Sequence, residues 1–273
     1  MWYITYTLTL VMVKVKGVLK IIMGKVITNR LGEENYNQHH TLMKIINYRS
    51  ASDIDVEFQD EHKYVAKNMR YDYFKDGRLQ NPFDKTVLGV GYLGKNYITK
   101  EDSKAYCTWH GMLERCYDST YQQKKPTYKG CFVCNEWLNY SVFRQWYDNN
   151  FYVIKNDQLH LDKDILKKKN KCYCPEHCIL VPRRINSLFT NGTSVRGQLP
   201  VGVTLDRTTY RARLSTLEKG RIDLGHYKNI EDAFNAYKIA KESYIKQVAE
   251  EYKSQIPKRL YEAMYNWIVE IDD

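Results

Sequence analysis

The chain has 273 residues, which is enough for two or three small domains with hydrophobic cores of their own. Its apolar fraction of 43% and aromatic fraction of 14% exclude a chain that is disordered throughout. The formal net charge of +10 favours a polyanionic partner, most often nucleic acid, although a solvated lysine-rich surface would give the same total. The 24 tyrosines favour nucleic acid, because rings beside cations suit base stacking and phosphate contact.

The first 30 residues leave three interpretations open. Residues 1–13 are all apolar or threonine, and Lys14, Lys16 and Lys20 then interrupt the run. A membrane span needs about 20 mostly apolar residues, and a signal peptide carries its positive charge at the start, so the segment fits neither pattern. The alternatives are a leader upstream of a translation start at Met23, a β-rich element, and a membrane anchor. We expect no membrane partner.

Residues 31–95 predict a small, strongly bent β-domain followed by a linker. An alternation of period two, with β-branched and aromatic residues, is typical of strands. The first run has Met43 and Ile45, followed out of phase by Ile46 and Tyr48, and the second has Ile54, Val56 and Phe58. A polar Ser-Ala-Ser-Asp segment joins the two runs. The turn-rich segment 75–83 closes this domain, and the glycine-rich segment 88–96 predicts the linker.

Residues 96–192 predict a domain that contains helices. Pro126 and Gly130 mark a loop between two helices, and the residues from Ile185 to Phe189 predict a further short helix. The apolar face of the first helix consists of Ala105, Trp109, Met112, Leu113 and Cys116, and that of the second of Trp137, Leu138, Val142, Phe143, Trp146 and Tyr147.

The last segment, residues 193–273, gives the clearest prediction. Three short strands at 201–205, 210–216 and 221–227 are joined by the hairpin sequences "DRTT" and "LEKG". Asn229 is a good N-cap for the helix that follows. The apolar stripe of this helix consists of Ala233, Phe234, Tyr237, Ala240, Tyr244, Ile245, Val248 and Tyr252. We therefore expect a three-stranded sheet packed on one helix here, and an α+β fold for the chain.

One face of this expected sheet is rich in arginine. Side chains alternate faces along a strand, so Val201, Val203 and Leu205, with Ala212 and Leu214, should face the helix. Three guanidinium groups on a flat sheet suit the major groove of double-stranded DNA, where arginine bonds guanine and phosphate contacts fix the docking. An ordinary solvated sheet face is the alternative. The cations of the opposite face are Arg211, Arg213 and Arg221, flanked by Arg207 and Lys219.

The segment from Pro200 to Tyr244 resembles an AP2 domain. The matching motifs are Gly202-Val203, Tyr210-Arg211-Ala212, Leu224-Gly225-His226-Tyr227, Glu231-Asp232-Ala233 and Ala236-Tyr237. In that family the three-stranded sheet lies in the DNA major groove. The resemblance therefore implies that this segment is a DNA-binding domain.

The middle segment resembles the HNH-type proteins of bacteriophages and mobile elements, which often carry a C-terminal AP2 domain. The matching pieces are Trp109, Met112 to Tyr117, Cys134, Glu136-Trp137, Leu161 to Leu166, Asn170, Tyr173, Pro175-Glu176, Cys178, Val181-Pro182 and Ile185-Asn186. HNH nucleases hold one divalent metal between a β-hairpin and a helix. The resemblance implies Mg²⁺ or another divalent cation, with Asp162 and Asn186 as ligands and Asn170 ordering the loop. It also implies a location in the cytoplasm of a bacterial host cell.

The chain departs from the HNH pattern at Lys163, which stands where the water-activating histidine is expected. A protonated lysine does not readily accept a proton from water. His160, two residues before Asp162, could turn inward to replace that histidine, or Lys163 could itself act in catalysis. We favour a nuclease-like fold used to bind double-stranded DNA. The alternative is an active metal-dependent endonuclease of homing type, and the second alternative is a basic protein-interaction module.

The cysteines offer a competing interpretation, a structural zinc site. Cys131 and Cys134 form a C-x-x-C pair, and two of Cys172, Cys174, His177 and Cys178, such as Cys174 and Cys178, could complete a tetrahedral site. The spacing is loose, so we favour buried thiols that act as small apolar residues, and we expect no structural zinc. The total of seven cysteines is odd, which indicates free or metal-bound thiols in a reducing compartment.

Overall fold

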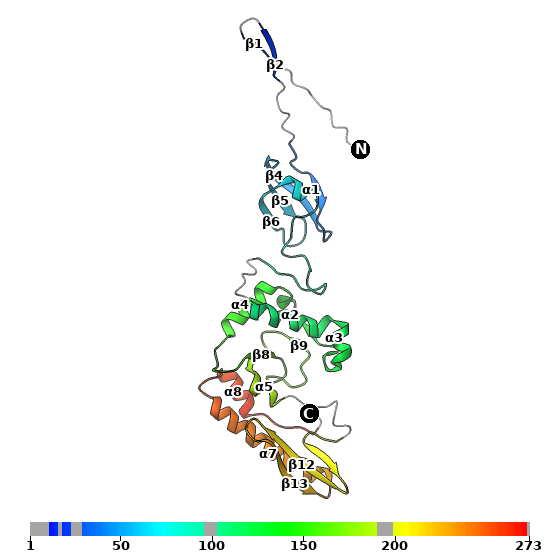
Figure 1. Cartoon of the computed structure of the whole chain (residues 1–273), viewed down its shortest axis with the longest axis vertical. Helices are drawn as coiled ribbons and strands as arrows, with labels where there is room; N and C mark the ends of the chain where they lie inside the picture. Colours follow the sequence, from blue (N-terminus) through cyan, green and yellow to red (C-terminus); the bar gives the residue numbers. More distant parts are fainter. Residues whose placement is uncertain (1–10, 16–17, 23–28, 96–102, 190–198, 272–273) are drawn as a thin grey trace. The chain divides into compact units, whose positions relative to one another are not determined.

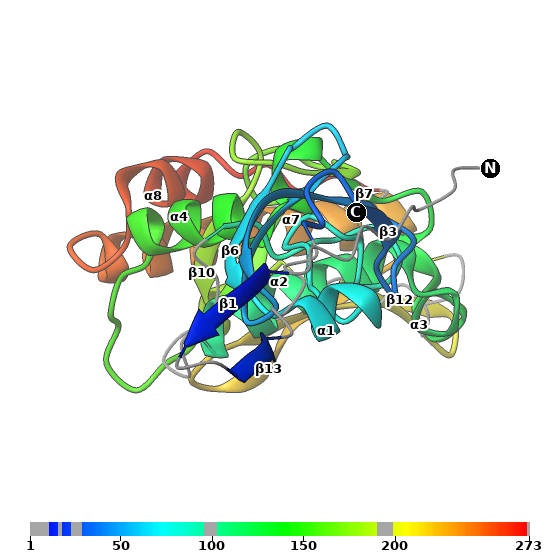
Figure 2. The same cartoon turned by 90° about the horizontal axis from the view of Figure 1, so that it is seen from above.

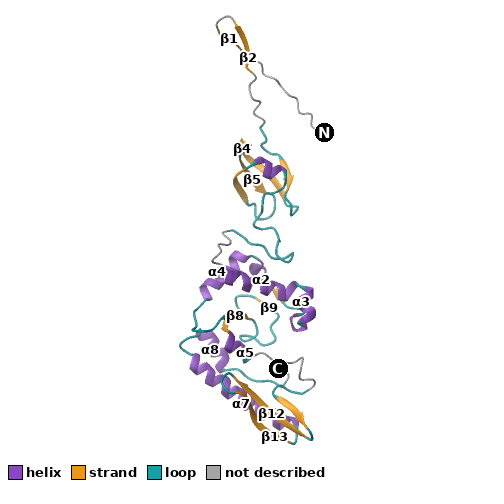
Figure 3. Cartoon of the chain, viewed as in Figure 1, coloured by secondary structure: helices purple, strands orange, loops and turns teal. Residues whose placement is uncertain are grey.

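The computed structural model describes residues 11–15, 18–22, 29–95, 103–189 and 199–271, and the chain divides into two compact units, 1–84 and 85–273 (Figure 1). Helices and small sheets are mixed along the chain, which agrees with the predicted α+β class (Figure 3). Among the described residues, no helix combines the length and the apolar character needed to cross a membrane.

The first unit contains a hairpin and a four-stranded antiparallel sheet. The hairpin pairs β1 (Val11–Val15) with β2 (Val18–Ile22), so this part of the first 30 residues is β structure. Met23, the alternative translation start, lies outside the described residues. The sheet order is β3 (Glu34–Tyr36), β4 (Leu42–Ser50), β5 (Asp53–Phe58) and β6 (Val65–Met69), and helix α1 (Tyr71–Lys75) contacts β5. Figure 2 shows β3, β6 and α1 of this unit from above.

The alternation predicted for this sheet is confirmed. Both runs form the centre of the sheet, in β4 and β5, and the polar segment between them is the turn. Register shifts between the two strands bend the pair, because an extra residue in one strand turns its direction. The fully buried core residues are Met43, Ile45, Ile54, Val56 and Phe58, with Phe74 from α1.

The second unit begins with a helical layer. Its elements are α2 (Ser103–Tyr117), α3 (Ser119–Lys124), the 3-10 turns η2 (Pro126–Tyr128) and η3 (Asn135–Leu138), and α4 (Tyr140–Asn150). The predicted face of α2 is confirmed, since all five of its residues are buried. The face predicted for α4 is wrong at Val142, which is 40% exposed. Asn139 caps α4 by accepting from the Ser141 amide, so the helix begins at Tyr140, and the spacing of Tyr140, Phe143 and Tyr147 sets the buried face.

The glycine-rich segment that predicted a linker packs instead against this helical layer. Its backbone bonds to η3 and α4: the Tyr92 amide donates to the Leu138 carbonyl, and the Tyr140 amide donates to the Tyr92 carbonyl. A β-carbon at Gly91 would lie 2.5 Å from Leu113 Cδ1. The glycine therefore permits the chain to cross α2 closely, and residues 85–95 belong to the second unit.

Two pairs of short strands and a short helix follow the helical layer. β7 (Phe132–Val133) pairs in parallel with β9 (Cys172–Tyr173), and β8 (Leu159–Asp162) pairs antiparallel with β10 (Ile179–Pro182). Helix α5 (Arg183–Ser187) begins directly after β10. Strand β8, its antiparallel partner β10 and helix α5 thus lie next to one another.

The C-terminal segment forms the three strands and the helix that the sequence predicts. β11 (Val203–Asp206), β12 (Thr209–Thr216) and β13 (Gly220–Tyr227) form an antiparallel sheet in that order, and α7 (Ile230–Tyr252) contacts all three strands. Asn229 is the N-cap, because its Oδ1 accepts from the Asp232 amide at 2.8 Å. One expectation is wrong: Leu205 is 59% exposed near the end of β11, although Val203 on the same face is buried.

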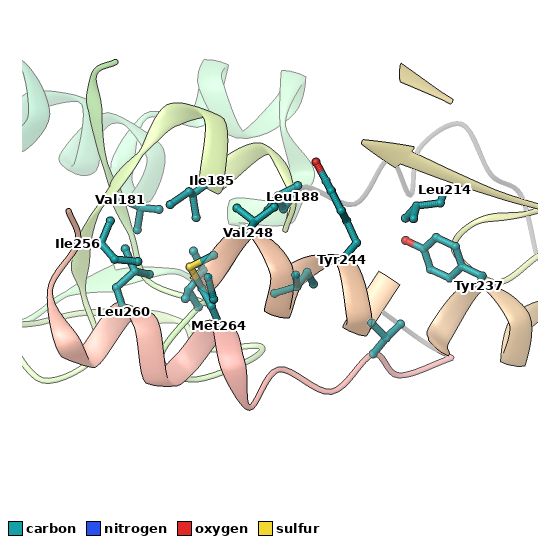
Figure 4. Packing of buried hydrophobic residues seen from close by; sticks show 14 of the residues in the cluster. Val181, Ile185, Leu188, Leu214, Tyr237, Tyr244, Val248, Ile256, Leu260 and Met264 are labelled. Atoms are coloured by element: carbon teal, nitrogen blue, oxygen red, sulfur yellow. The ribbon is translucent and has the colours of Figure 1, made fainter. Parts of the chain in front are cut away.

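A single hydrophobic cluster joins this segment to the middle one. Figure 4 shows Val181 of β10 and Ile185 of α5 beside side chains of α7 and of α8 (Lys258–Tyr265), a helix that the sequence did not predict. Val248 of α7 and Leu260 of α8 belong to the same cluster and are fully buried. The domain boundary predicted at 192/193 lies outside the described residues. On its two sides the chain shares one core.

Candidate nucleic-acid interface

The β8–β10 pair and α5 bring the predicted site residues of the middle segment to one pocket. In the strand register, Asp162 lies opposite Ile179 and His160 opposite Val181. Because α5 starts where β10 ends, Asn186 returns to the side of β8. A pocket of about 380 Å³ is lined by His160, Asp162, Lys163 and Asn186. A neighbouring hollow of about 550 Å³ shares three of these residues and adds Asn170.

Lys163 points into the protein rather than into solvent. Its side chain is 8% exposed, and its Nζ donates to Asp164 Oδ1 at 2.8 Å, to Asp164 Oδ2 at 2.6 Å and to the Asn170 carbonyl at 2.6 Å. Asn170 Nδ2 donates in return to the carbonyls of Lys163 and Cys172. The two side chains therefore close the loop 163–170, and the ammonium group already has three acceptors. A lysine that contacts phosphate is normally exposed. The buried ammonium group of Lys163 is therefore not placed for such a contact.

Asp162 orders the start of the same loop. Its Oδ1 accepts from the amides of Asp164 at 2.8 Å and Ile165 at 2.7 Å. Burial raises the pKa of the Asp162 carboxyl, and those two backbone hydrogen bonds offset part of that effect. One of the two carboxylate oxygens, Oδ1, is thus engaged with the backbone.

His160 remains a candidate proton acceptor. It is exposed on β8 and lines the pocket. Its pKa is lowered, first by desolvation and then by the positive charge of Arg183. A lowered pKa keeps the imidazole neutral near pH 7, and a neutral imidazole can accept a proton. The geometry therefore keeps His160 available for the role that Lys163 does not serve.

The predicted metal ligands, Asp162 and Asn186, are not part of a cluster of metal-binding side chains among the described residues. Within the described ranges, no three histidine, cysteine, aspartate or glutamate side chains are arranged so as to hold a metal ion. The cysteines of the zinc hypothesis carry free thiols, of which Cys131, Cys174 and Cys178 are buried. Burial raises the pKa of Cys134 to about 12 and that of Cys174 to about 11, so both thiols are protonated at neutral pH in this state.

The predicted cations of the sheet lie on the face opposite α7, but they differ in their partners. Arg211 donates through Nε to Asp223 Oδ2 at 2.7 Å and through Nη2 to the same oxygen. Arg213 donates to Thr204 Oγ1 at 3.2 Å, and neither Arg213 nor Arg221 forms an ion pair with any described residue. Ala212 and Leu214, which alternate with these arginines on β12, are buried against α7. The remaining cations, Arg207, Lys219 and Arg221, are exposed.

Sequence reasoning missed two members of these surfaces. Asp223 alternates with Leu224 and so lies on the arginine face, but its pairing with Arg211 across the strands depends on the register shift at Ala212/Arg213. Arg115 lines the pocket from α2, and its Nε donates to the Tyr173 hydroxyl at 3.1 Å. The helical periodicity marks only apolar positions of α2, so Arg115 gave no signal beyond its place in the motif.

Comparison of the chain with protein-family models, with curated proteins and with solved structures gives no match. What the sheet and the pocket do is therefore inferred from their residues and contacts.

Proposed function

We propose that this protein binds double-stranded DNA, and that the sheet β11–β12–β13 enters the major groove. The observation that carries the proposal is the free face of the sheet, where Arg213 and Arg221 have no carboxylate partner among the described residues. Guanidinium groups in such positions can bond guanine edges or phosphates. The apolar opposite face is covered by α7, so DNA is left the polar face only. In this proposal the C-terminal segment is an AP2-like domain.

The ion pair between Arg211 and Asp223 is compatible with this role. Both side chains are partly exposed, at 34% and 42%, so solvent screens their attraction and the pairing contributes little to stability. A phosphate can therefore replace the carboxylate at small cost. In the absence of DNA, Asp223 holds the guanidinium group of Arg211 over the sheet.

The pocket of the middle segment supports a second contact with DNA. Lys168, Lys169 and Lys171 line the larger hollow, beside Asn170. In this proposal β8, β10 and α5 form an HNH-like unit that retains the fold of a nuclease and serves binding.

The salt dependence of DNA binding tests the proposal. We expect a fluorescein-labelled duplex to bind with an affinity that falls steeply as salt rises from about 50 to 200 mM, with a log–log slope of about −0.9 for each neutralised phosphate. Polyglutamate, an acidic polypeptide, serves as competitor. Binding that polyglutamate displaces as well as unlabelled DNA does, or no binding at low salt, would contradict DNA as the partner.

Endonuclease activity is the second candidate, because a histidine with a lowered pKa lies in one pocket with Asp162 and Asn186. The test is incubation of supercoiled plasmid with the protein and Mg²⁺ or Mn²⁺. We expect slow cleavage or none, since Lys163 stands at the histidine position. Robust metal-dependent cleavage that His160→Ala or Asp162→Ala abolishes would establish the endonuclease and overturn the binding-only account.

A further inference from the structure

The guanidinium group of Arg115, in the second unit, has no role in the function proposed above. It lies between two tyrosine rings, with its Cζ 5.6 Å from the centre of the Tyr173 ring and 5.9 Å from that of Tyr128. Tyr173 is 2% exposed, so one wall of this arrangement is fixed in the core. Cation–π contacts of this kind hold a guanidinium group in a defined plane.

Most of the hydrogen-bonding capacity of Arg115 is unused by the described part of the chain. Its one hydrogen bond runs from Nε to the Tyr173 hydroxyl, a neutral acceptor, and no ion pair is formed with a described carboxylate. A guanidinium group has five N–H donors. Partial burial of a charge without a counter-charge is unfavourable unless something compensates it. Arg115 lines the 380 Å³ pocket, so its remaining N–H donors are in a position to bind a ligand there.

The two carboxylates nearest to this pocket are already engaged. Asp164 receives the ammonium of Lys163 on both oxygens, and Asp162 receives two backbone amides on Oδ1. Neither of them forms an ion pair with Arg115. Arg115 thus lines this pocket without an ion-pair partner among the described residues.

We propose that Arg115 binds a backbone phosphate of nucleic acid in this pocket. Arginine suits a phosphate because two parallel N–H donors match two phosphate oxygens. This inference rests on the proposed DNA binding, and it assigns to Arg115 the phosphate contact that the buried Lys163 does not make.

Chemical modification of the unaltered protein tests the inference without a variant that could misfold. 2,3-Butanedione reacts with accessible arginines, and peptide mass spectrometry gives the rate at each one with and without a saturating DNA duplex. We expect Arg115 to react in the free protein and to be protected by DNA. Arg213 and Arg221 should behave in the same way. Protection of the sheet arginines but not of Arg115 overturns this inference and leaves the proposed function standing. Protection of none of them overturns the proposed function itself. An Arg115 that the reagent does not reach also overturns the inference, because a phosphate could not reach it either.

Substitutions give the second measurement. Arg115→Lys keeps the charge and loses the planar pair of donors, so we expect duplex affinity to fall about tenfold or more. Tyr173→Phe removes the hydrogen bond that orients the group and should cause a smaller loss. Lys104→Gln, which removes an exposed charge from the same helix, is the control and should change affinity less than threefold. Equal affinities for Arg115→Lys and the control, with both proteins folded, would show that Arg115 is structural.

Discussion

Gly202 and Tyr237 approach each other so closely that a β-carbon at position 202 would lie 2.1 Å from a carbon of the tyrosine ring. Gly202 directly precedes β11, and Tyr237 is buried on α7. The backbone φ of Gly202 is +78°, a conformation that residues with a β-carbon rarely adopt. This contact places the first strand of the sheet on its helix, and it gives a physical reason for the Gly-Val and Ala-Tyr motifs.

Substitution of this glycine should destabilise the second unit. Gly202→Ala combines a left-handed backbone with a steric overlap, and we expect a loss of about 2–4 kcal/mol in the free energy of unfolding. Gly220→Ala is the matched control, since its φ is +67° but nothing lies within 4 Å of the added carbon. The control should lose only about 1–2 kcal/mol. Urea unfolding followed by circular dichroism measures both, and equal losses would contradict the close contact.

Lys163 should act on stability more than on DNA binding. Lys163→Met removes the ammonium group that donates a hydrogen bond to the buried Asn170 carbonyl. We therefore expect the free energy of unfolding to fall by about 1–3 kcal/mol. Duplex affinity of the folded variant should change less than about threefold, because the ammonium group faces inward. Lys167→Met, an exposed position of the same loop, is the control for lost charge. A large loss of affinity at unchanged stability would show that Lys163 contacts phosphate after all.

The pKa of Asp162 predicts a pH dependence of stability. Its pKa is raised in the folded state, so the folded chain binds a proton more readily than the unfolded chain. The contribution of this group to stability must therefore fall as pH rises from the ordinary value of 3.8 through the raised pKa. Asp162→Asn keeps an oxygen for the two amides and removes the titration. Relative to the parent, this variant should become more stable as pH rises through that window.

Thermal unfolding at a series of pH values measures the difference. Asp162→Ala is the companion variant, and its loss of both acceptor bonds should cost about 1–3 kcal/mol at any pH in this range. A parent that gains stability over Asp162→Asn as pH rises would show that the fold favours the carboxylate.

Metal analysis tests the expectation about zinc. Protein purified without chelators should contain well under one zinc per chain, because Cys131, Cys134, Cys174 and Cys178 are loosely spaced and, among the described residues, no three histidine, cysteine, aspartate or glutamate side chains are arranged to hold a metal ion. A stoichiometric zinc that is lost in Cys131→Ser or Cys178→Ser would contradict this expectation.

The periodicity of the sequence predicted the strands and helices whose formation depends on residues close to one another in the chain. It did not predict those whose position depends on contacts with residues far away in the chain. The strands with Met43 and Ile54, and the helix capped by Asn229, were predictable because alternation and capping are local properties. The start of α4 was missed, since Asn139 Oδ1 accepts from the Ser141 amide and begins the helix after the first apolar residues of the predicted face. Helix α8 was missed because its apolar face completes the core shared by β10 and α5.

The candidate site shows the same division. Motif spacing was enough to collect Asp162, Asn170 and Asn186, because a hairpin followed by a helix returns them to one place. The inward direction of Lys163 depends on acceptors supplied by its own loop, which the spacing does not encode. The contribution of Arg115 depends on the packing of α2 against Tyr173, so only the fold brings it to the pocket.

Duplex affinity of a sheet variant tests the central claim most directly. The variant Arg213→Gln/Arg221→Gln is compared with Lys253→Gln/Lys258→Gln, which loses the same charge from exposed positions at the end of α7 and on α8. Fluorescence anisotropy with the same labelled duplex gives both affinities across a salt series. DNA binding through the sheet predicts that the arginine variant binds at least about tenfold more weakly than the lysine variant, with a shallower salt slope and an unchanged melting temperature. If the two variants bind equally well, the sheet is not the DNA-binding face.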